Sequence, residues 1–294
     1  MKLLSFISQL FSHEKKTDEE LADSGLMLIQ AYYFLVILFF QKYLAYWDLL
    51  STKPQLIDSW LSGWLFSSPE RSLFLGVIII TGCLSFFALL IRPLALFPRI
   101  TGFISLQLYH AYYVASYTYH DYYALALVSL PLLFLPTTKA LRENKKQALE
   151  QLFLCLWFCA AVVLTLYFVS GLANLSAGIQ QMGSGSISFF HPQSVPYFIL
   201  YQMQSLTREP MLAKWAIAHY NFLYPFVILI FFEKLLCPLA LYKTKMLPFV
   251  GIFFLFFHFS NALFFGLPFS RQALMLLLFL ILNPIQNKKA PILK

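Results

Sequence analysis

Residues 151–172 read QLFLCLWFCAAVVLTLYFVSGL, an apolar run without a single charged residue. A helix needs about 20 such residues to cross the hydrocarbon core of a membrane. Because the apolarity is continuous and does not alternate along the chain, the run predicts a helix and not a strand of a barrel. Eight runs of this kind are predicted to span the membrane: 25–46, 72–91, 100–118, 121–137, 151–172, 216–236, 246–265 and 271–286.

The composition of the chain points to the same class of protein. Hydrophobic residues make up 60% of the 294 residues and charged residues only 12%, whereas soluble domains average about 45–50% and 25%. So little polar surface excludes an ordinary soluble enzyme, a disordered chain and a disulfide-rich secreted scaffold. The sequence therefore predicts an all-α integral membrane protein with about eight transmembrane helices in a single domain. This domain covers 21–286, between an interfacial segment at 1–20 and a basic cytoplasmic tail at 287–294.

Lysine and arginine residues are distributed unevenly between the predicted loops. The terminal segments and the loops after the second, fourth and sixth spans, together with Lys234 at the inner end of the sixth span, hold 15 of the 21. Because Lys and Arg are enriched in cytoplasmic loops, both termini are predicted to lie in the cytoplasm of what we expect to be a bacterial inner membrane. No basic stripe or nucleic-acid motif accompanies the net charge of +8, so no nucleic-acid partner is expected.

The four cysteines do not form a recognisable ligand or disulfide pattern. Cys83, Cys155, Cys159 and Cys237 lie in or beside apolar runs, and their spacing contains no CxxC pair. Cys155 and Cys159 share a helix face, but no histidine or carboxylate lies near them in the sequence. No metal site is therefore expected.

Several polar residues fall inside predicted spans, where such groups are costly and need partners. His258 and Asn261 are three residues apart on one face of the seventh span, and His110 lies near the middle of the third. A single intramembrane histidine is often only an interhelical hydrogen bond, and this alternative stays open for His110 and for His219. The pair in the seventh span is the stronger candidate for a functional site.

Two further groups of side chains have both a structural and a functional interpretation. Glu233 lies beside Lys234 at the inner end of the sixth span, where an interfacial salt bridge or a helix-end role is the favoured explanation. Seven tyrosines lie between Tyr109 and Tyr123. They fit an aromatic belt at the membrane interface, or alternatively an aromatic wall for a flat, lipid-soluble ring such as a quinone.

Three segments of the chain are similar in order, spacing and polar residues to a known family. They read HDYYALALVSLPLLFLP from His120, YFVSGLANL from Tyr167 and FHFSNALFFGLPFSRQALML from Phe257. They resemble the membrane domain of vitamin K-dependent gamma-carboxylase and its bacterial relatives, the HTTM (horizontally transferred transmembrane) family. The resemblance covers about residues 25–286, and its most specific parts are the His-x-x-Asn stretch of the seventh span (His258 to Asn261) and the Tyr-Phe-x-x-Gly stretch that ends the fifth.

The resemblance implies roles for particular residues. In the carboxylase, a lysine after the Tyr-Phe-x-x-Gly stretch is taken as the base that deprotonates vitamin K hydroquinone. The family histidine thought to assist proton abstraction matches His120, and the pair in the seventh span matches His258 and Asn261. The lysine, however, aligns with Asn174, and an amide cannot take up a proton at physiological pH. We therefore expect His120 or His258 to serve as the base instead.

The remaining candidate residues are expected to hold a cosubstrate. The resemblance implies a reduced quinone similar to vitamin K, bound in a polar pocket that opens outward between the third, fourth, fifth and seventh spans. Arg271 would be an anion anchor at the start of the eighth span. The residues expected to contact the cosubstrate are Asn261, Tyr167, Gly171, His110 and Arg271.

Three functions are compatible with these features. The first is a carboxylase-related enzyme that uses a quinol-like cosubstrate to modify a peptide or a small molecule at the outer face. The second is a non-catalytic member of the same fold that binds membrane lipid or helps to mature an exported peptide or small membrane protein; the loss of the lysine favours it. A transporter is the least favoured, because the inner halves of the spans offer few charges besides Glu233.

Overall fold

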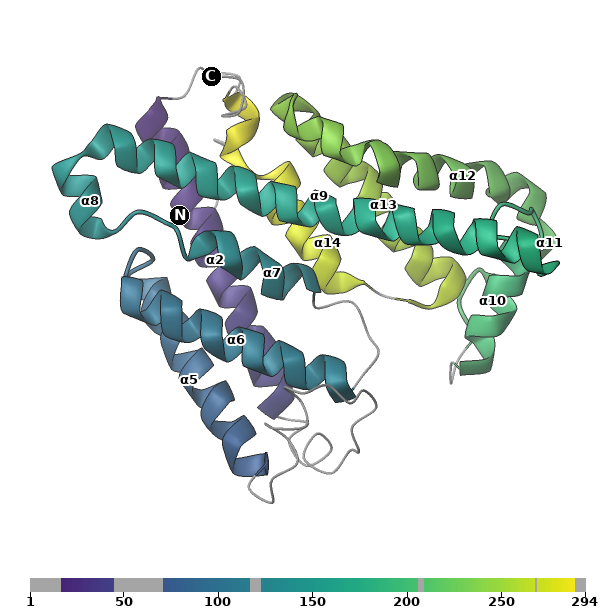
Figure 1. Ribbon diagram of the computed structural model, residues 1–294, viewed down its shortest axis with the longest axis horizontal. Helices are drawn as coiled ribbons and strands as arrows, with labels where there is room; N and C mark the ends of the chain where they lie inside the picture. The colour runs from purple at the N-terminus through teal and green to yellow at the C-terminus, as the bar shows by residue number, and fades with distance from the viewer. Residues whose placement is uncertain (1–16, 45–70, 117–122, 206–208, 268, 289–294) are drawn as a thin grey trace. The chain divides into compact units, whose positions relative to one another are not determined.

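The computed structural model describes residues 17–44, 71–116, 123–205, 209–267 and 269–288 (Figure 1). Every regular element within these ranges is helical, so the predicted all-α class is confirmed for this part of the chain. Five of the described helical segments are long and apolar enough to cross a membrane. They are Asp18–Phe40, Leu73–Ile91, Lys145–Ser184, Tyr220–Leu241 and Thr244–Phe265. These five are compatible with an integral membrane protein, and the other three predicted spans also fall on helices.

The helices form two compact units, which are described separately. The N-terminal unit comprises the described parts of Met1–Cys159 together with Leu282–Ile285, and the C-terminal unit comprises the described parts of Ala160–Ile281 and Gln286–Lys294. The single transmembrane domain predicted for residues 21–286 stays a prediction. The N-terminal unit contains α2 (Asp18–Leu44), α5 (Arg71–Ile91), α6 (Leu96–Ser116), α7 (Tyr123–Leu132), α8 (Thr138–Glu143) and the start of α9 (Lys145–Ser184).

Aromatic side chains and small residues hold the N-terminal unit together. Helix α5 packs against both α2 and α6 (Figure 1). The rings of Phe40 and Tyr109 meet edge to face at 5.4 Å, and both are fully buried. A Cβ atom at Gly82 would lie 2.8 Å from the ring of Phe40, so α5 approaches α2 this closely only because residue 82 is glycine.

A buried arginine joins the start of α6 to the end of α7. Arg99 is only 3% exposed, although it belongs to a predicted loop. Its guanidinium donates to backbone carbonyls at the end of α7 and just before α6: Leu132, Leu133, Leu135, Leu94 and Ala95. The last carbonyls of a helix lack intrahelical partners, and a cation is favourable there. Arg99 therefore satisfies a helix end that Pro131 helps to terminate.

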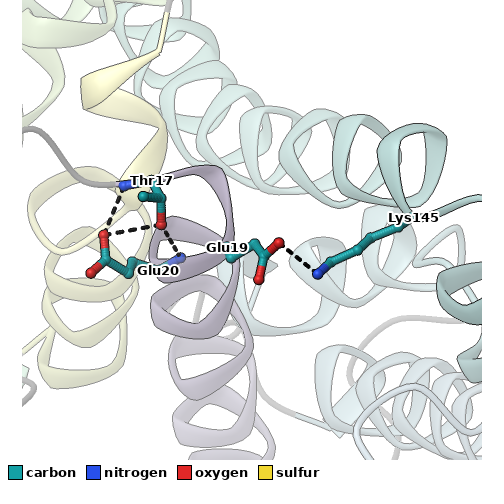
Figure 2. Close-up of polar contacts among 4 residues, drawn as sticks. All are labelled: Thr17, Glu19, Glu20 and Lys145. Atoms are coloured by element: carbon teal, nitrogen blue, oxygen red, sulfur yellow. Dashed lines mark hydrogen bonds and ion pairs between the residues drawn. The ribbon is translucent and has the colours of Figure 1, made fainter.

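The first turn of α2 is closed by a capping box (Figure 2). The backbone N–H of Glu20 donates to Thr17 Oγ1 at 3.3 Å, and the backbone N–H of Thr17 donates to Glu20 Oε2 at 2.7 Å. This reciprocal pair satisfies two backbone donors at the start of a helix. The spacing of Thr17 and Glu20 in the sequence is the signature of such a box, and it marks the start of α2 well before the predicted apolar run.

Replacing Thr17 with alanine is expected to lower the free energy of unfolding by about 1 kcal/mol, because the N–H of Glu20 loses its acceptor. Thermal unfolding of the purified protein in detergent measures the change. Glu19→Gln is the matched control. It removes the ion pair between Glu19 and Lys145 (2.6 Å, Figure 2), which is well exposed and is expected to contribute less than about 0.5 kcal/mol. Equal effects of the two substitutions would contradict the assignment of the cap.

The C-terminal unit contains the rest of α9 and the helices that follow it. They are α10 (Ser194–Ser205), α11 (Ala213–Ala218), α12 (Tyr220–Leu236), the 3-10 turns η1 (Cys237–Leu241) and η2 (Thr244–Met246), α13 (Leu247–Phe265), α14 (Ser270–Leu276), the π-helical turn η3 (Leu277–Ile281) and the 3-10 turn η4 (Pro284–Asn287). The predicted sixth span is thus interrupted at His219, which separates α11 from α12. Helix α13 packs against α14 and η3.

Helix α9 extends farther than its apolar run. The predicted fifth span ends at residue 172, whereas the helix continues to Ser184 and contains 40 residues. At a rise of 1.5 Å per residue, such a helix is about 60 Å long, roughly twice the thickness of the hydrocarbon core. The apolar run indicates which part of a helix is compatible with lipid, but it does not indicate where the helix ends. No proline interrupts residues 173–184, so helical geometry continues into the polar segment.

Candidate functional site

A hydrogen bond between Tyr167 and His258 is at the centre of the candidate site. The hydroxyl of Tyr167, in α9, contacts Nε2 of His258, in α13, although the two residues are 91 positions apart in the chain. Tyr167 is 7% exposed and His258 is 5% exposed. The structure therefore brings together two predicted site residues as a buried polar pair.

The pattern of side chains along α13 explains why His258 faces inward. Large apolar side chains are exposed on one face of the helix: Phe249, Ile252, Phe256 and Phe259. The opposite face carries Gly251, Phe254 and His258, which are buried. A Cβ atom at Gly251 would lie 2.8 Å from Ile281, so this face lies close to η3. An outward face of this kind suits lipid, and the polar residue is placed on the protected side.

Aromatic rings surround the hydrogen-bonded pair. The ring of Tyr167 stacks on Phe254 with centroids 4.0 Å apart and an interplanar angle of 13°. The rings of Phe257 and Phe269 lie 5.2 Å and 5.3 Å from the ring of His258. The polar pair is thus enclosed by flat apolar groups, which is the setting in which an aromatic ligand is held.

Lys234 of α12 is a member of the site that the sequence did not predict. Its side chain is 8% exposed, its Nζ donates to Ser170 Oγ at 3.3 Å, and its ammonium lies 5.0 Å from the centroid of Phe257. Lys234 is also close enough to interact electrostatically with His258. Glu233, for which an interfacial salt bridge or a helix-end role was expected, forms no ion pair with a described residue and lies in the last turn of α12. The signal that could have identified this position is a lysine near the end of a largely apolar helix.

Gly171 allows Lys234 to reach the site. A Cβ atom at position 171 would lie 3.1 Å from Cβ of Lys234 and 3.1 Å from Leu235 Cδ2. Contacts this short are tighter than a side chain ordinarily accepts, so the glycine lets α12 approach α9 closely. Gly171 thus contributes to the site as a spacer between helices, and not as a direct contact to a ligand.

The hydrogen bond between Lys234 and Ser170 corrects the predicted depths of these residues. The sequence places Ser170 at the outer end of the fifth span and Lys234 at the inner end of the sixth. Two atoms 3.3 Å apart lie at one level, so both assignments cannot hold. The extension of α9 to Ser184 gives the reason, because the apolar run is not the only part of this helix that can lie in the membrane. The site residues on α9 therefore lie well before the end of this helix at Ser184.

One ring nitrogen of His258 has no partner. Its Nδ1 is buried and forms no hydrogen bond with any residue that the structure describes. In a neutral imidazole one nitrogen accepts and the other donates. The direction of the hydrogen bond between Tyr167 and Nε2 depends on the tautomer of the ring; when Tyr167 donates, Nδ1 carries the hydrogen and is an unused donor in the site.

Other predicted site residues in the C-terminal unit lie near this group in the sequence. Asn174 is half-buried on α9, about one turn beyond Gly171. The backbone carbonyl of Asn261 accepts from Gly266, whose φ of 66° ends α13, and from Leu267 at 3.3 Å, so the backbone of Asn261 has a structural task. Arg271 is half-buried in the first turn of α14.

The structure does not place either of the two remaining predicted histidines in this group. His110 belongs to α6 of the N-terminal unit, where its ring meets Tyr123 edge to face at 4.9 Å and its Nδ1 is buried without a partner in the described structure. His120 lies outside the described residues, as do three of the seven clustered tyrosines, Tyr117, Tyr119 and Tyr122. The predicted pocket between the third, fourth, fifth and seventh spans therefore stays a prediction. His219 is exposed and bonds to the carbonyl of Trp215, four residues earlier, so its described hydrogen bond is local and not interhelical.

Comparisons with known proteins assign no function to the site. No protein-family model, curated protein or solved structure matches the chain. The relationship to the HTTM family thus stays a prediction from the quoted segments. Within the described part of the chain, no group of three or more His, Cys, Asp or Glu side chains could hold a metal ion.

Proposed function

We propose that this chain is a multi-pass membrane protein related to the HTTM family, with eight spans and both termini in the cytoplasm. Its site around Tyr167 and His258 binds a quinol-like, lipid-soluble cosubstrate and uses it to modify a peptide or small molecule at the outer face. The observation that carries the proposal is the buried hydrogen bond between these two side chains, enclosed by aromatic rings. Buried polar pairs inside apolar helices are expensive and are commonly retained for function.

The chemistry of the pair suits a quinol. The flat rings of Phe254, Phe257 and Phe269 provide apolar faces for an aromatic ligand. His258 can take up a proton from a quinol hydroxyl in the tautomer in which Nε2 donates to Tyr167 and Nδ1 has a free lone pair, and Tyr167 fixes the orientation of the ring. His258 then has the role of base that the amide of Asn174 cannot have.

The test is oxygen-dependent oxidation of a reduced naphthoquinone by the purified protein in detergent. His258→Ala is expected to lower the rate by about 100-fold or more, because the proton acceptor is removed. His219→Ala is the matched control, since that histidine is exposed and bonds only locally to Trp215. Equal rates for the wild type and His258→Ala would overturn the proposed role of His258.

A second candidate function is favoured by Asn174. Without a lysine at this position, the protein would bind lipid or a quinone, or assist an exported peptide, without turnover. The same experiment separates the two functions. Saturable binding of the naphthoquinone that depends on His258, with no oxidation above the background of His258→Ala, would establish binding alone.

A further inference from the structure

The ammonium of Lys234 is a buried charge that lacks a counter-charge. Its described partners are the hydroxyl of Ser170 and the ring of Phe257, both of which are neutral. By contrast, three lysines that form ion pairs do so with exposed side chains: Lys139 with Glu143, Lys145 with Glu19 and Lys214 with Glu209. Removing an unpaired ion from water is strongly unfavourable unless another charge or several hydrogen bonds compensate for it.

A second group in the same place also lacks a partner. Nδ1 of His258 is buried and unbonded in the described structure, and its ring is close enough to Lys234 for the two to interact electrostatically. An ammonium has three hydrogens to donate, and Lys234 uses one of them for Ser170. The site is therefore rich in donors, and it is short of an acceptor that carries negative charge.

We propose that this acceptor is the ligand, and that Lys234 binds the oxygen anion of an amphiphile whose apolar body lies against Phe254, Phe257 and Phe269. The inference rests on the site proposed above and adds the charge of its ligand. The carboxylate of a fatty acid and the phenolate of a quinol share this chemistry. A small soluble anion does not fit it, because the surrounding rings offer no other polar contact.

The experiment measures the preference of the purified full-length protein for an acid over its neutral analogue. One arm compares oleate with oleyl alcohol, and the other compares a naphthoquinol with its dimethyl ether. The wild type is expected to bind the ionisable member of at least one pair about tenfold or more tightly, since hydrogen bonds to charged groups are the strong ones. The arm that shows the preference identifies the source of the anion.

Lys234→Met is expected to reduce this preference to about one, because methionine keeps the apolar stem and removes the charge. Lys234→Arg should retain part of the preference. Lys214→Met is the matched control in the same unit, where the lysine is exposed and paired with Glu209. A preference that survives Lys234→Met, or a wild type that shows none in either arm, would overturn the inference.

A stability measurement separates this role from a purely structural one. Without ligand, Lys234→Met is expected to unfold at the same temperature as the wild type or higher, because the substitution removes an uncompensated buried charge. A lower unfolding temperature together with an unchanged preference would show that Lys234 only holds helices together. A preference for the anion without oxidation of the naphthoquinol would refute the proposed enzyme and leave the role of Lys234 intact. Oxidation without a preference for the anion would support the enzyme and refute the role of Lys234.

Discussion

Replacing Arg99 with methionine is expected to lower the free energy of unfolding by about 3–5 kcal/mol. The guanidinium is 3% exposed, and its shortest hydrogen bond is 2.6 Å, to the carbonyl of Leu135. Methionine fills much of the same space but donates nothing. The carbonyls of Leu132, Leu133 and Leu135 would then lose a donor at a helix end that has no intrahelical substitute.

Thermal unfolding in detergent, followed by circular dichroism, measures this loss. Arg92→Met is the matched control, because Arg92 is exposed at the end of α5 and should tolerate the change within about 0.5 kcal/mol. Arg99→Lys should recover only part of the stability, since one ammonium cannot reproduce the planar set of five N–H groups. A similar small effect for Arg99→Met and Arg92→Met would show that the carbonyls find other donors.

Gly171→Val is expected to separate α9 from α12, destabilising the protein by about 1–3 kcal/mol. The first atom of the new side chain would already lie 3.1 Å from Cβ of Lys234 and 3.4 Å from its backbone carbonyl carbon. Backbone atoms cannot rotate out of the way, and the two methyl groups of valine require still more space. As α12 moves, Nζ of Lys234 leaves Ser170, so the preference for the acid over its neutral analogue should also fall.

Gly183→Val provides the control on the same helix. A Cβ atom at position 183 meets nothing within 4 Å, so valine there changes only the local helix propensity. Both variants are measured by thermal unfolding and by the ratio of oleate to oleyl alcohol binding. If Gly171→Val matched Gly183→Val in both measurements, close approach of α9 and α12 would not be what positions Lys234.

The helices were predictable because apolar runs must satisfy their backbone hydrogen bonds internally, and a helix does so within one segment. Each of the eight predicted spans overlaps a described helix, although parts of the first, third and fourth lie outside the described residues. The end of α9 was not predictable from the same signal, because its polar last turns are helical without being apolar. The burial of Arg99 was not predictable either, because its position beside a loop says nothing about the carbonyls at the end of α7, which lie more than 30 residues away in the chain.

The members of the candidate site were easier to predict than their contacts. Tyr167, Gly171 and His258 are all predicted site residues, and the structure gives each of them a place in one group. The pairing of Tyr167 with His258 joins α9 to α13, and no local pattern encodes such a distant contact. The sequence assigned a role at the helix end to Glu233 alone and none to its neighbour Lys234, whereas adjacent residues on a helix point in different directions.

The burial of Lys234 also bears on how the chain is synthesised. Helices leave the ribosome in order, so Ser170 precedes Lys234, whereas Phe257 and His258 follow it. A lysine that enters hydrocarbon alone costs about 2.5–3.5 kcal/mol on insertion scales. Only the short turns η1 and η2 separate α12 from α13. If the two helices entered a bilayer as one hairpin, the ammonium would arrive together with the ring that covers it, and the charge would not face lipid without Phe257.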